Sequence, residues 1–116
     1  MELIDEIEEL IMMHQEGSYW DFKREWYDDS KDGDLLIDII CMANNLVDRD
    51  AYIIIGVNEE CDYAIHDVSQ DANRRNTQML TDFIRGKKFA GDFRPVVTVE
   101  QVHLDGGLVD VIVVHN

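Results

Sequence analysis

The sequence predicts an α+β domain in which helices pack against a mixed β-sheet. Three observations support this class: helical spacing of apolar residues near the start of the chain, a continuous apolar run at 51–57, and a strong hairpin signal near the end. The expected order of elements is α-β-α-β-β-α-β-β, and a chain of 116 residues suits one domain, 1–116. The chain stops straight after an apolar strand, which favours the N-terminal piece of a longer protein.

The first predicted elements are a helix over 2–14 and a strand over 19–26. Apolar residues recur at helical spacing in 2–14, acids occupy its first turn, and Gly17 is expected to end it. Residues 19–26 alternate in the manner of a strand. One face of this strand carries Trp20 and Phe22, and the other carries Tyr19, Asp21, Lys23 and Glu25.

A second helix, buried on most of its sides, is predicted at 35–47, where nearly all residues are apolar. It follows an acidic loop at 27–34, in which Ser30 or Asp32 is expected to cap the helix. Cys41 falls within this helix and is expected in the core.

The remaining predicted strands lie at 51–57, 63–68, 96–104 and 108–115. The first of them is continuously apolar, which is typical of a central strand, and a polar turn at 58–62 separates it from the second. Ser69 is expected to cap a helix over 70–85 that Gly86 ends. The segment Asp105-Gly106-Gly107 between the last two strands is the hairpin signal.

Composition and motifs exclude several classes of protein. No apolar run reaches the length of a transmembrane helix, and the acidic N-terminus is unlike a secretory signal peptide. Cys41 and Cys61 have no metal-ligand spacing, which favours a reduced, cytoplasmic protein. The histidines lack the spacing of a zinc site, no Gly-rich phosphate loop points to an ATPase, and neither Ser18 nor Ser30 has a histidine placed for a nucleophilic triad.

The net charge of -15 argues against general binding of nucleic acid, because such binding needs Lys and Arg beside phosphates. The charge is uneven, however: residues 1–73 contain 20 acids and 4 bases, whereas residues 74–94 contain 6 bases and 2 acids. The basic segment 74–94 is therefore expected to face a polyanion, although its charges also fit a solvated surface. The residues expected to contact nucleic acid are Lys23, Arg74, Arg75, Arg85, Lys87, Lys88 and Arg94.

Three carboxylates lie near the ends of the predicted strands 19–26 and 51–57. If these strands are neighbours in one sheet, Glu16, Asp21 and Glu59 converge, with Lys23 beside them. Clustered carboxylates supply oxygen ligands for Mg²⁺ or Mn²⁺, and a lysine offsets the charge of a phosphate. Asp21-Phe22-Lys23 also fits the acid-x-Lys element of many metal nucleases. An open alternative is that Glu16 accompanies a helix end and that Asp21 and Lys23 form a solvated strand face.

The same residues resemble a known family. The elements that carry the resemblance are Glu16-x4-Asp21-Phe22-Lys23, an apolar helix followed by Ala43-Asn44-Asn45, and Ile53-Ile54-Ile55-Gly56-Val57-Asn58-Glu59. They are similar to the Schlafen-type Alba-like domain, also called the divergent Alba domain. The matching stretch covers 16–59, and the later helix and hairpin follow in the expected order. The resemblance implies a DNA-binding domain of the kind that often opens bacterial transcriptional-regulator-like proteins.

The resemblance also implies a second activity. Related domains in vertebrate Schlafen proteins cleave RNA with three carboxylates, which by position fall on Glu16, Asp21 and Glu59. Asp21 stands where the family usually has Glu, Glu59 stands where it usually has Asp, and Asp48-Arg49-Asp50 replaces a usual Gly-Gly. Each acid swap changes the reach of the carboxylate by about 1.5 Å, which bears directly on metal geometry.

The sequence therefore leads to three hypotheses in order of preference. The first is a DNA-binding domain of a bacterial regulator-like protein. The second is an endonuclease that cleaves RNA or DNA, with Glu16, Asp21 and Glu59 as ligands for Mg²⁺ or Mn²⁺ and Lys23 in the active site. The third is a module for protein interaction or homo-oligomerisation, which the acidic charge favours.

Overall fold

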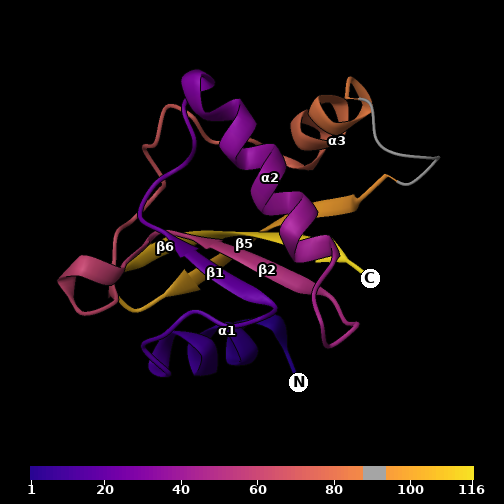
Figure 1. The fold of residues 1–116 in the computed structure, drawn as a ribbon. Helices are drawn as coiled ribbons and strands as arrows, with labels where there is room; N and C mark the ends of the chain where they lie inside the picture. The colour runs from indigo at the N-terminus through magenta and orange to yellow at the C-terminus, as the bar shows by residue number, and fades with distance from the viewer. Residues whose placement is uncertain (88–93) are drawn as a thin grey trace.

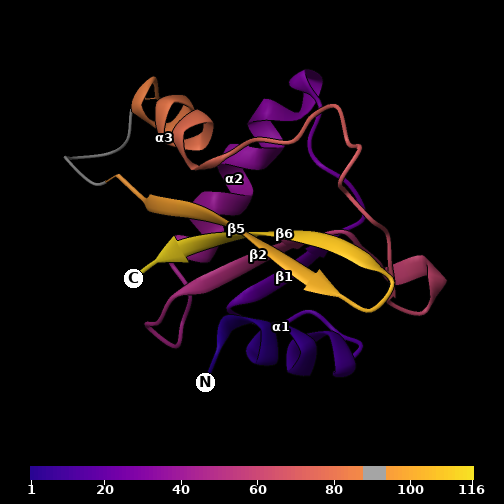
Figure 2. The ribbon, with the colours of Figure 1, turned by 180° about the vertical axis from the view of Figure 1, so that it is seen from behind.

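A four-stranded sheet forms the centre of the molecule, and helices cover both of its faces (Figures 1 and 2). The computed structural model describes residues 1–87 and 94–116. Its helices are α1 (Leu3–Met12), α2 (Asp32–Ala43) and α3 (Thr77–Arg85), with short 3-10 helices at Asp29–Lys31 and Glu59–Cys61. Its strands are β1 (Trp20–Lys23), β2 (Ala51–Ile55), β3 (Val57–Asn58), β4 (Ala64–Ile65), β5 (Val96–Leu104) and β6 (Gly107–His115). The predicted α+β class with a mixed sheet is confirmed.

The order of strands in the main sheet is β1-β2-β6-β5. β1 and β2 are parallel, with Lys23 opposite Ile55, and α2 forms the crossover between them. β2 is antiparallel to β6, and β6 forms the predicted hairpin with β5. β2 is buried at all five positions, which confirms the central strand.

Two apolar cores lie on opposite sides of this sheet. α1 contributes Ile7 and Leu10 to the core on one side, where they pack with Trp20 and Phe22 of β1. α2 and α3 pack on the other side, and the buried residues that they contribute are Leu35, Ile39, Leu80 and Ile84. Because side chains alternate along β1, Asp21 and Lys23 point away from α1 and toward the side covered by α2. None of the helices in the described part of the chain combines the length and apolar character that a bilayer crossing requires.

The apolar run 51–57 is one predicted strand but two strands in the structure, because Gly56 breaks it. Gly56 has a φ of 118°, and a Cβ there would lie 3.0 Å from the Val109 side chain and 3.1 Å from the His66 carbonyl oxygen. The Gly56 N–H donates to the Lys23 carbonyl at 2.7 Å, which fixes the bend beside the end of β1. β3 then leaves the main sheet and pairs with β4, the only strand that forms within the predicted 63–68.

The first helix ends earlier than predicted, and Gly17 is not its stop. α1 ends at Met12, and His14 adopts a left-handed φ of 51°, so the helix has stopped before Gly17 is reached. Gly17 instead pairs with Trp20 in an isolated bridge, and any Cβ at this position would collide with the Trp20 ring. The Trp20 indole N–H donates to the Gln15 carbonyl at 2.9 Å and fixes the same turn.

The other two helices correct the sequence-based expectations as well. α2 begins at Asp32 without a side-chain cap and exposes Ile37 and Cys41, so the prediction that Cys41 is a core residue was wrong. Asp28, rather than Ser30 or Asp32, caps the preceding 3-10 helix. α3 begins at Thr77 because the Asn76 side chain accepts from the Met79 N–H at 2.8 Å, so Ser69 is not its cap; the predicted end at Gly86 is confirmed.

One carboxylate, Asp110 on β6, is buried with only 1% exposure. It accepts hydrogen bonds from Arg74 Nε at 2.9 Å and Nη2 at 3.0 Å, and from the Trp26 indole N–H at 2.8 Å. A buried charge is costly unless ion pairs and hydrogen bonds satisfy it, and all three bonds serve that purpose here.

We expect Arg74→Met to destabilise the protein by about 3 kcal/mol, because the Asp110 carboxylate would stay buried without its ion-pair partner. The matched control is Arg24→Met, which removes an exposed pair with Glu25 and should cost less than about 1 kcal/mol. Urea unfolding followed by circular dichroism measures both values. Equal stability of the two variants would show that the Asp110 pair contributes little.

Candidate functional site

The structure brings together the three carboxylates that the sequence singled out. Glu16 lies in the turn before β1, Asp21 lies within β1, and Glu59 begins the 3-10 helix after β3. Their ligand oxygens all lie within 4.8 Å of one another. Glu16 and Glu59 are exposed and Asp21 is half-buried, so the cluster is open to solvent on one side.

The parallel pairing of β1 with β2 explains this convergence. Parallel strands end at the same edge of a sheet, so the residues that follow β2 emerge beside the end of β1. The bend at Gly56 then turns the chain through β3, which brings Glu59 beside Asp21. The position of Glu16 is set separately by the turn that packs Gly17 against Trp20.

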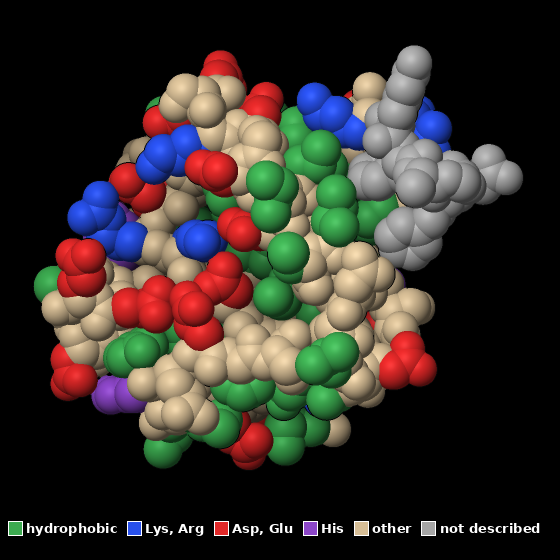
Figure 3. Space-filling model, viewed as in Figure 1, with side chains coloured by type: hydrophobic (Ala, Val, Ile, Leu, Met, Phe, Trp, Pro, Cys, Tyr) green, Lys and Arg blue, Asp and Glu red, His purple; other side chains and the backbone are tan. Residues whose placement is uncertain are grey.

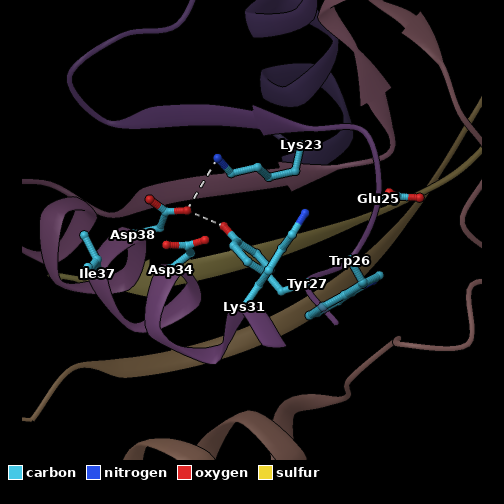
Figure 4. A pocket seen from close by; sticks show the side chains of 8 residues that line it. All are labelled: Lys23, Glu25, Trp26, Tyr27, Lys31, Asp34, Ile37 and Asp38. Carbon is cyan, nitrogen blue, oxygen red and sulfur yellow. Dashed lines mark hydrogen bonds and ion pairs between the residues drawn. The ribbon is translucent and has the colours of Figure 1, made fainter. Parts of the chain in front are cut away.

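Lys23 sits beside the cluster and is held by two carboxylates. Its Nζ atom lies 3.3 Å from Asp21 Oδ2 and 3.5 Å from Asp38 Oδ2. The Tyr27 hydroxyl donates a hydrogen bond to the same Asp38 oxygen, with 2.6 Å between the two oxygens. Figure 4 shows Lys23 and Tyr27 both directed at Asp38. Sequence reasoning missed Asp38 and Tyr27, and the signal that was available is the single acid within the apolar run of α2.

The surroundings of Asp21, Lys23 and Tyr27 shift their pKa values. Burial raises the pKa of Asp21 from 3.8 to about 6, and the neighbouring Glu16 carboxylate adds to the rise while Lys23 opposes it. Burial alone would lower the pKa of Lys23, but the Asp21 and Asp38 carboxylates outweigh that effect and raise it. Burial and the bond to Asp38 raise the pKa of Tyr27, which keeps its hydroxyl protonated as a donor.

The donor set fits a hard divalent cation. Carboxylate oxygens are the preferred ligands of Mg²⁺ and Mn²⁺, and two oxygens on opposite sides of a bound Mg²⁺ are roughly 4 Å apart. The observed 4.8 Å limit is slightly wider. Glu16 and Glu59 are exposed and have flexible side chains, so rotation about their own bonds can bring their oxygens closer together.

A hollow of about 390 Å³ lies next to the cluster, and its charged walls are three bases, Lys23, Arg24 and Lys31, and three acids, Glu25, Glu59 and Glu60. Acidic side chains therefore meet three bases at one place on the surface. Figure 3 shows this meeting of charges on the same face as α2, with a second group of Lys and Arg side chains farther round that face. A phosphate entering the hollow would meet both cations and carboxylates at its walls.

The described part of the basic segment, 74–87 with Arg94, lies around α3, whereas Lys23 is the last residue of β1 (Figure 1). Arg74 is paired with Asp110, and Arg75 Nη2 lies 2.6 Å from Asp32 Oδ1, so both charges are balanced within the molecule. Arg85 pairs with Asp82 at the surface, where both side chains are exposed. Arg94 donates to the Arg85 carbonyl at 2.9 Å, and Lys87 lies over the Phe83 ring. Lys88 lies outside the described residues.

The comparisons with known proteins give one match. The model of the Schlafen, AlbA_2 family matches residues 16–116, a stretch that includes all three carboxylates and Lys23. The mixed four-stranded sheet with its three helices agrees with that domain. The searches of curated proteins and of solved structures found no match.

The raised pKa of Asp21 predicts a pH-dependent cost to stability. The native state keeps the Asp21 proton up to about pH 6, whereas the unfolded chain releases it near pH 3.8, so the free energy of unfolding falls as pH rises between these values. Asp21→Asn should therefore melt at a higher temperature than the wild type above pH 6 and at an equal temperature below pH 3.8. The control Asp29→Asn changes an exposed acid outside the cluster and should track the wild type. A constant difference between Asp21→Asn and the wild type over this range would contradict the assignment.

Proposed function

Because the chain belongs to the Schlafen AlbA_2 domain family, we propose that it binds nucleic acid through a phosphate held beside Lys23. This domain is associated with nucleic-acid binding. On the strength of the family resemblance, the proposal takes DNA as the polymer and a bacterial transcriptional-regulator-like protein as the setting.

The observation that carries this proposal is the position of Lys23 at the carboxylate cluster. Its ammonium is held in place by Asp21 and Asp38, and Arg24 and Lys31 line the same hollow. Three acids, Glu25, Glu59 and Glu60, line this hollow as well, so its bases are balanced until a cation offsets the acids. A phosphate backbone is repelled over most of the surface of a chain whose net charge is -15, so a place where bases gather favours a single, defined path.

A group of bases around the end of α3 supports the same path for the nucleic-acid backbone. Arg85, Lys87 and Arg94 lie around the end of α3, and Figure 3 shows Lys and Arg side chains there on the face that also carries the cluster. We place the backbone of the nucleic acid along this face, with Lys23 at one end and the end of α3 at the other. We assign Arg74 and Arg75 to the fold rather than to the phosphate contacts, because Asp110 and Asp32 balance their charges.

The three carboxylates have a defined part in this proposal. Without a cation they repel phosphate, so binding at the hollow is expected to require Mg²⁺ or Mn²⁺. Glu16, Asp21 and Glu59 would hold the ion, and the bound ion would supply positive charge for the phosphate oxygens. Lys23 would contact the same phosphate from the other side.

The convergence of the carboxylates favours a second candidate function, hydrolysis of a phosphodiester bond. A water molecule would attack phosphorus and its proton would pass to the Asp21 carboxylate. The bond from phosphorus to the leaving oxygen would break, and that oxygen would keep the electron pair and take a proton from solvent. Lys23 would offset the negative charge that builds up on the phosphate oxygens. The swapped acids, a shorter Asp21 and a longer Glu59, place this activity below binding.

The binding proposal predicts that a fluorescent single-stranded DNA binds the protein in the presence of Mn²⁺ and that affinity falls steeply with salt. Lys23→Met should weaken binding to every sequence alike and reduce the slope of log affinity against log salt by about 1. Gln70→Glu, at an exposed loop position, changes the net charge by the same amount and serves as the control. Fluorescence anisotropy measures both. Absence of binding to DNA and RNA at low salt with Mn²⁺ present would sink the proposal.

The hydrolysis candidate predicts cleavage of a labelled RNA or DNA only when Mn²⁺ or Mg²⁺ is added. Asp21→Ala and Glu59→Ala should each reduce the rate by roughly a hundredfold or more, because each removes a metal ligand. Asp62→Asn alters a 92% exposed acid just after the 3-10 helix and should cleave like the wild type. Gel electrophoresis of the products gives the rates. A well-folded protein that binds Mn²⁺ but leaves every substrate intact would exclude this activity.

A further inference from the structure

A second hollow adjoins the first and shares Lys23, Glu25 and Lys31 with it (Figure 4). It has a volume of about 260 Å³ and lies between the segment that follows β1 and the first turns of α2. This is below the roughly 300–1,000 Å³ of pockets for drug-sized ligands, so it suits one small group rather than an extended ligand. The side chains that matter for its chemistry are Lys23, Trp26, Tyr27, Lys31, Asp34 and Asp38.

Part of the wall is already committed to internal contacts. The Tyr27 hydroxyl donates to Asp38, and Asp38 also holds Lys23. The Trp26 indole N–H donates to buried Asp110 behind the hollow. These bonds fix the aromatic rings and Asp38 in place before any ligand arrives, so the wall is preorganised.

Two charged groups at the hollow remain available for a ligand. Lys31 and Asp34 are both exposed and both line the hollow. Neither the Lys31 ammonium nor the Asp34 carboxylate forms a hydrogen bond or ion pair with any residue that the structure describes. The hollow thus offers an acceptor and a donor that do not satisfy each other, and both face the space beside Lys23.

We propose that this hollow binds a guanine base of a single-stranded nucleic acid whose phosphate is held at Lys23. Guanine carries adjacent N–H donors, N1–H and N2–H₂, which a carboxylate such as Asp34 accepts as a pair. It also carries the acceptors O6 and N7, which a lysine such as Lys31 contacts. Adenine has one amino donor group beside N7 and lacks O6, so it satisfies this pair of side chains less well.

The same geometry favours a single-stranded ligand over a duplex. The N1–H and N2–H₂ donors that Asp34 would contact are used in base pairing within a duplex, whereas an unstacked base of a single strand can present them to a pocket. Since Lys23 borders both hollows, a phosphate at Lys23 and the base attached to the same nucleotide can occupy them together. The inference rests on the proposed function, because it needs a phosphate at Lys23, and it adds the identity of the neighbouring base.

The test uses three fluorescent oligonucleotides of oligo-dA that differ at one central position, which is guanine, hypoxanthine or adenine. Hypoxanthine keeps O6, N7 and N1–H but lacks the exocyclic amine. Wild-type protein in Mn²⁺ should bind the guanine strand about fivefold or more tightly than the adenine strand, with the hypoxanthine strand between them. Asp34→Asn and Lys31→Met should each bring the guanine-to-adenine ratio close to 1. Asp29→Asn makes the same charge change as Asp34→Asn away from the hollow and should keep the wild-type ratio.

The possible outcomes separate the two proposals. Equal affinity of the wild type for all three strands would overturn the guanine pocket and leave the proposed binding function standing. A guanine preference that persists in both Asp34→Asn and Lys31→Met would also overturn it, since the preference would then arise elsewhere. Absence of binding to every strand would overturn both proposals. Melting temperatures of the variants, which alter exposed side chains, confirm that each is folded.

Discussion

The buried carboxylate of Asp110 joins three parts of the chain that are far apart in sequence. It lies on β6 in the middle of the sheet, and it binds Trp26 in the segment after β1 and Arg74 in the loop before α3. The segments that carry Trp26 and Arg74 have little regular structure of their own, so these hydrogen bonds determine where they lie. Asp71 adds to the same connection by accepting the Trp26 backbone N–H at 2.9 Å. The position of the Trp26 ring in the hollow beside Lys23 therefore depends on the buried Asp110 carboxylate.

The pattern of side chains predicted most of the sheet and little of the helix boundaries. Alternation in β1, the apolar run of β2 and the Asp105-Gly106 hairpin are local signals, and each is confirmed. The start of α3 could not be chosen from sequence, because Ser69 and Asn76 are both residues that cap helices and only the structure shows which one does. The burial of α2 was overestimated for a related reason. Apolar residues occur all around this helix, and tertiary packing alone decides that Ile39 is buried and Ile37 exposed.

The convergence of the three carboxylates was predictable, because parallel strands end at the same edge of a sheet. The contacts of Lys23 and Tyr27 with Asp38 were not predictable. Asp38 belongs to a helix whose rotation about its own axis decides whether it meets Lys23, and sequence does not fix that rotation. The resemblance implies Glu where Asp21 stands and Asp where Glu59 stands. Asp21 reaches less far than Glu and Glu59 reaches farther than Asp, and their oxygens still approach within 4.8 Å. Burial is the main reason that the pKa of Asp21 is raised, and the nearby Glu16 carboxylate adds to the rise.

Gly17 has a consequence for how this domain can change over evolutionary time. Its lack of a side chain is required by the Trp20 ring, so the turn that carries Glu16 is held by core packing rather than by contacts to a ligand. The bend at Gly56, which directs Glu59, is likewise imposed by Val109 and His66. Selection for folding alone would thus preserve the arrangement of the backbone around the cluster. The three acids can be replaced while the backbone around them stays the same, so new chemistry can arise there without a new fold.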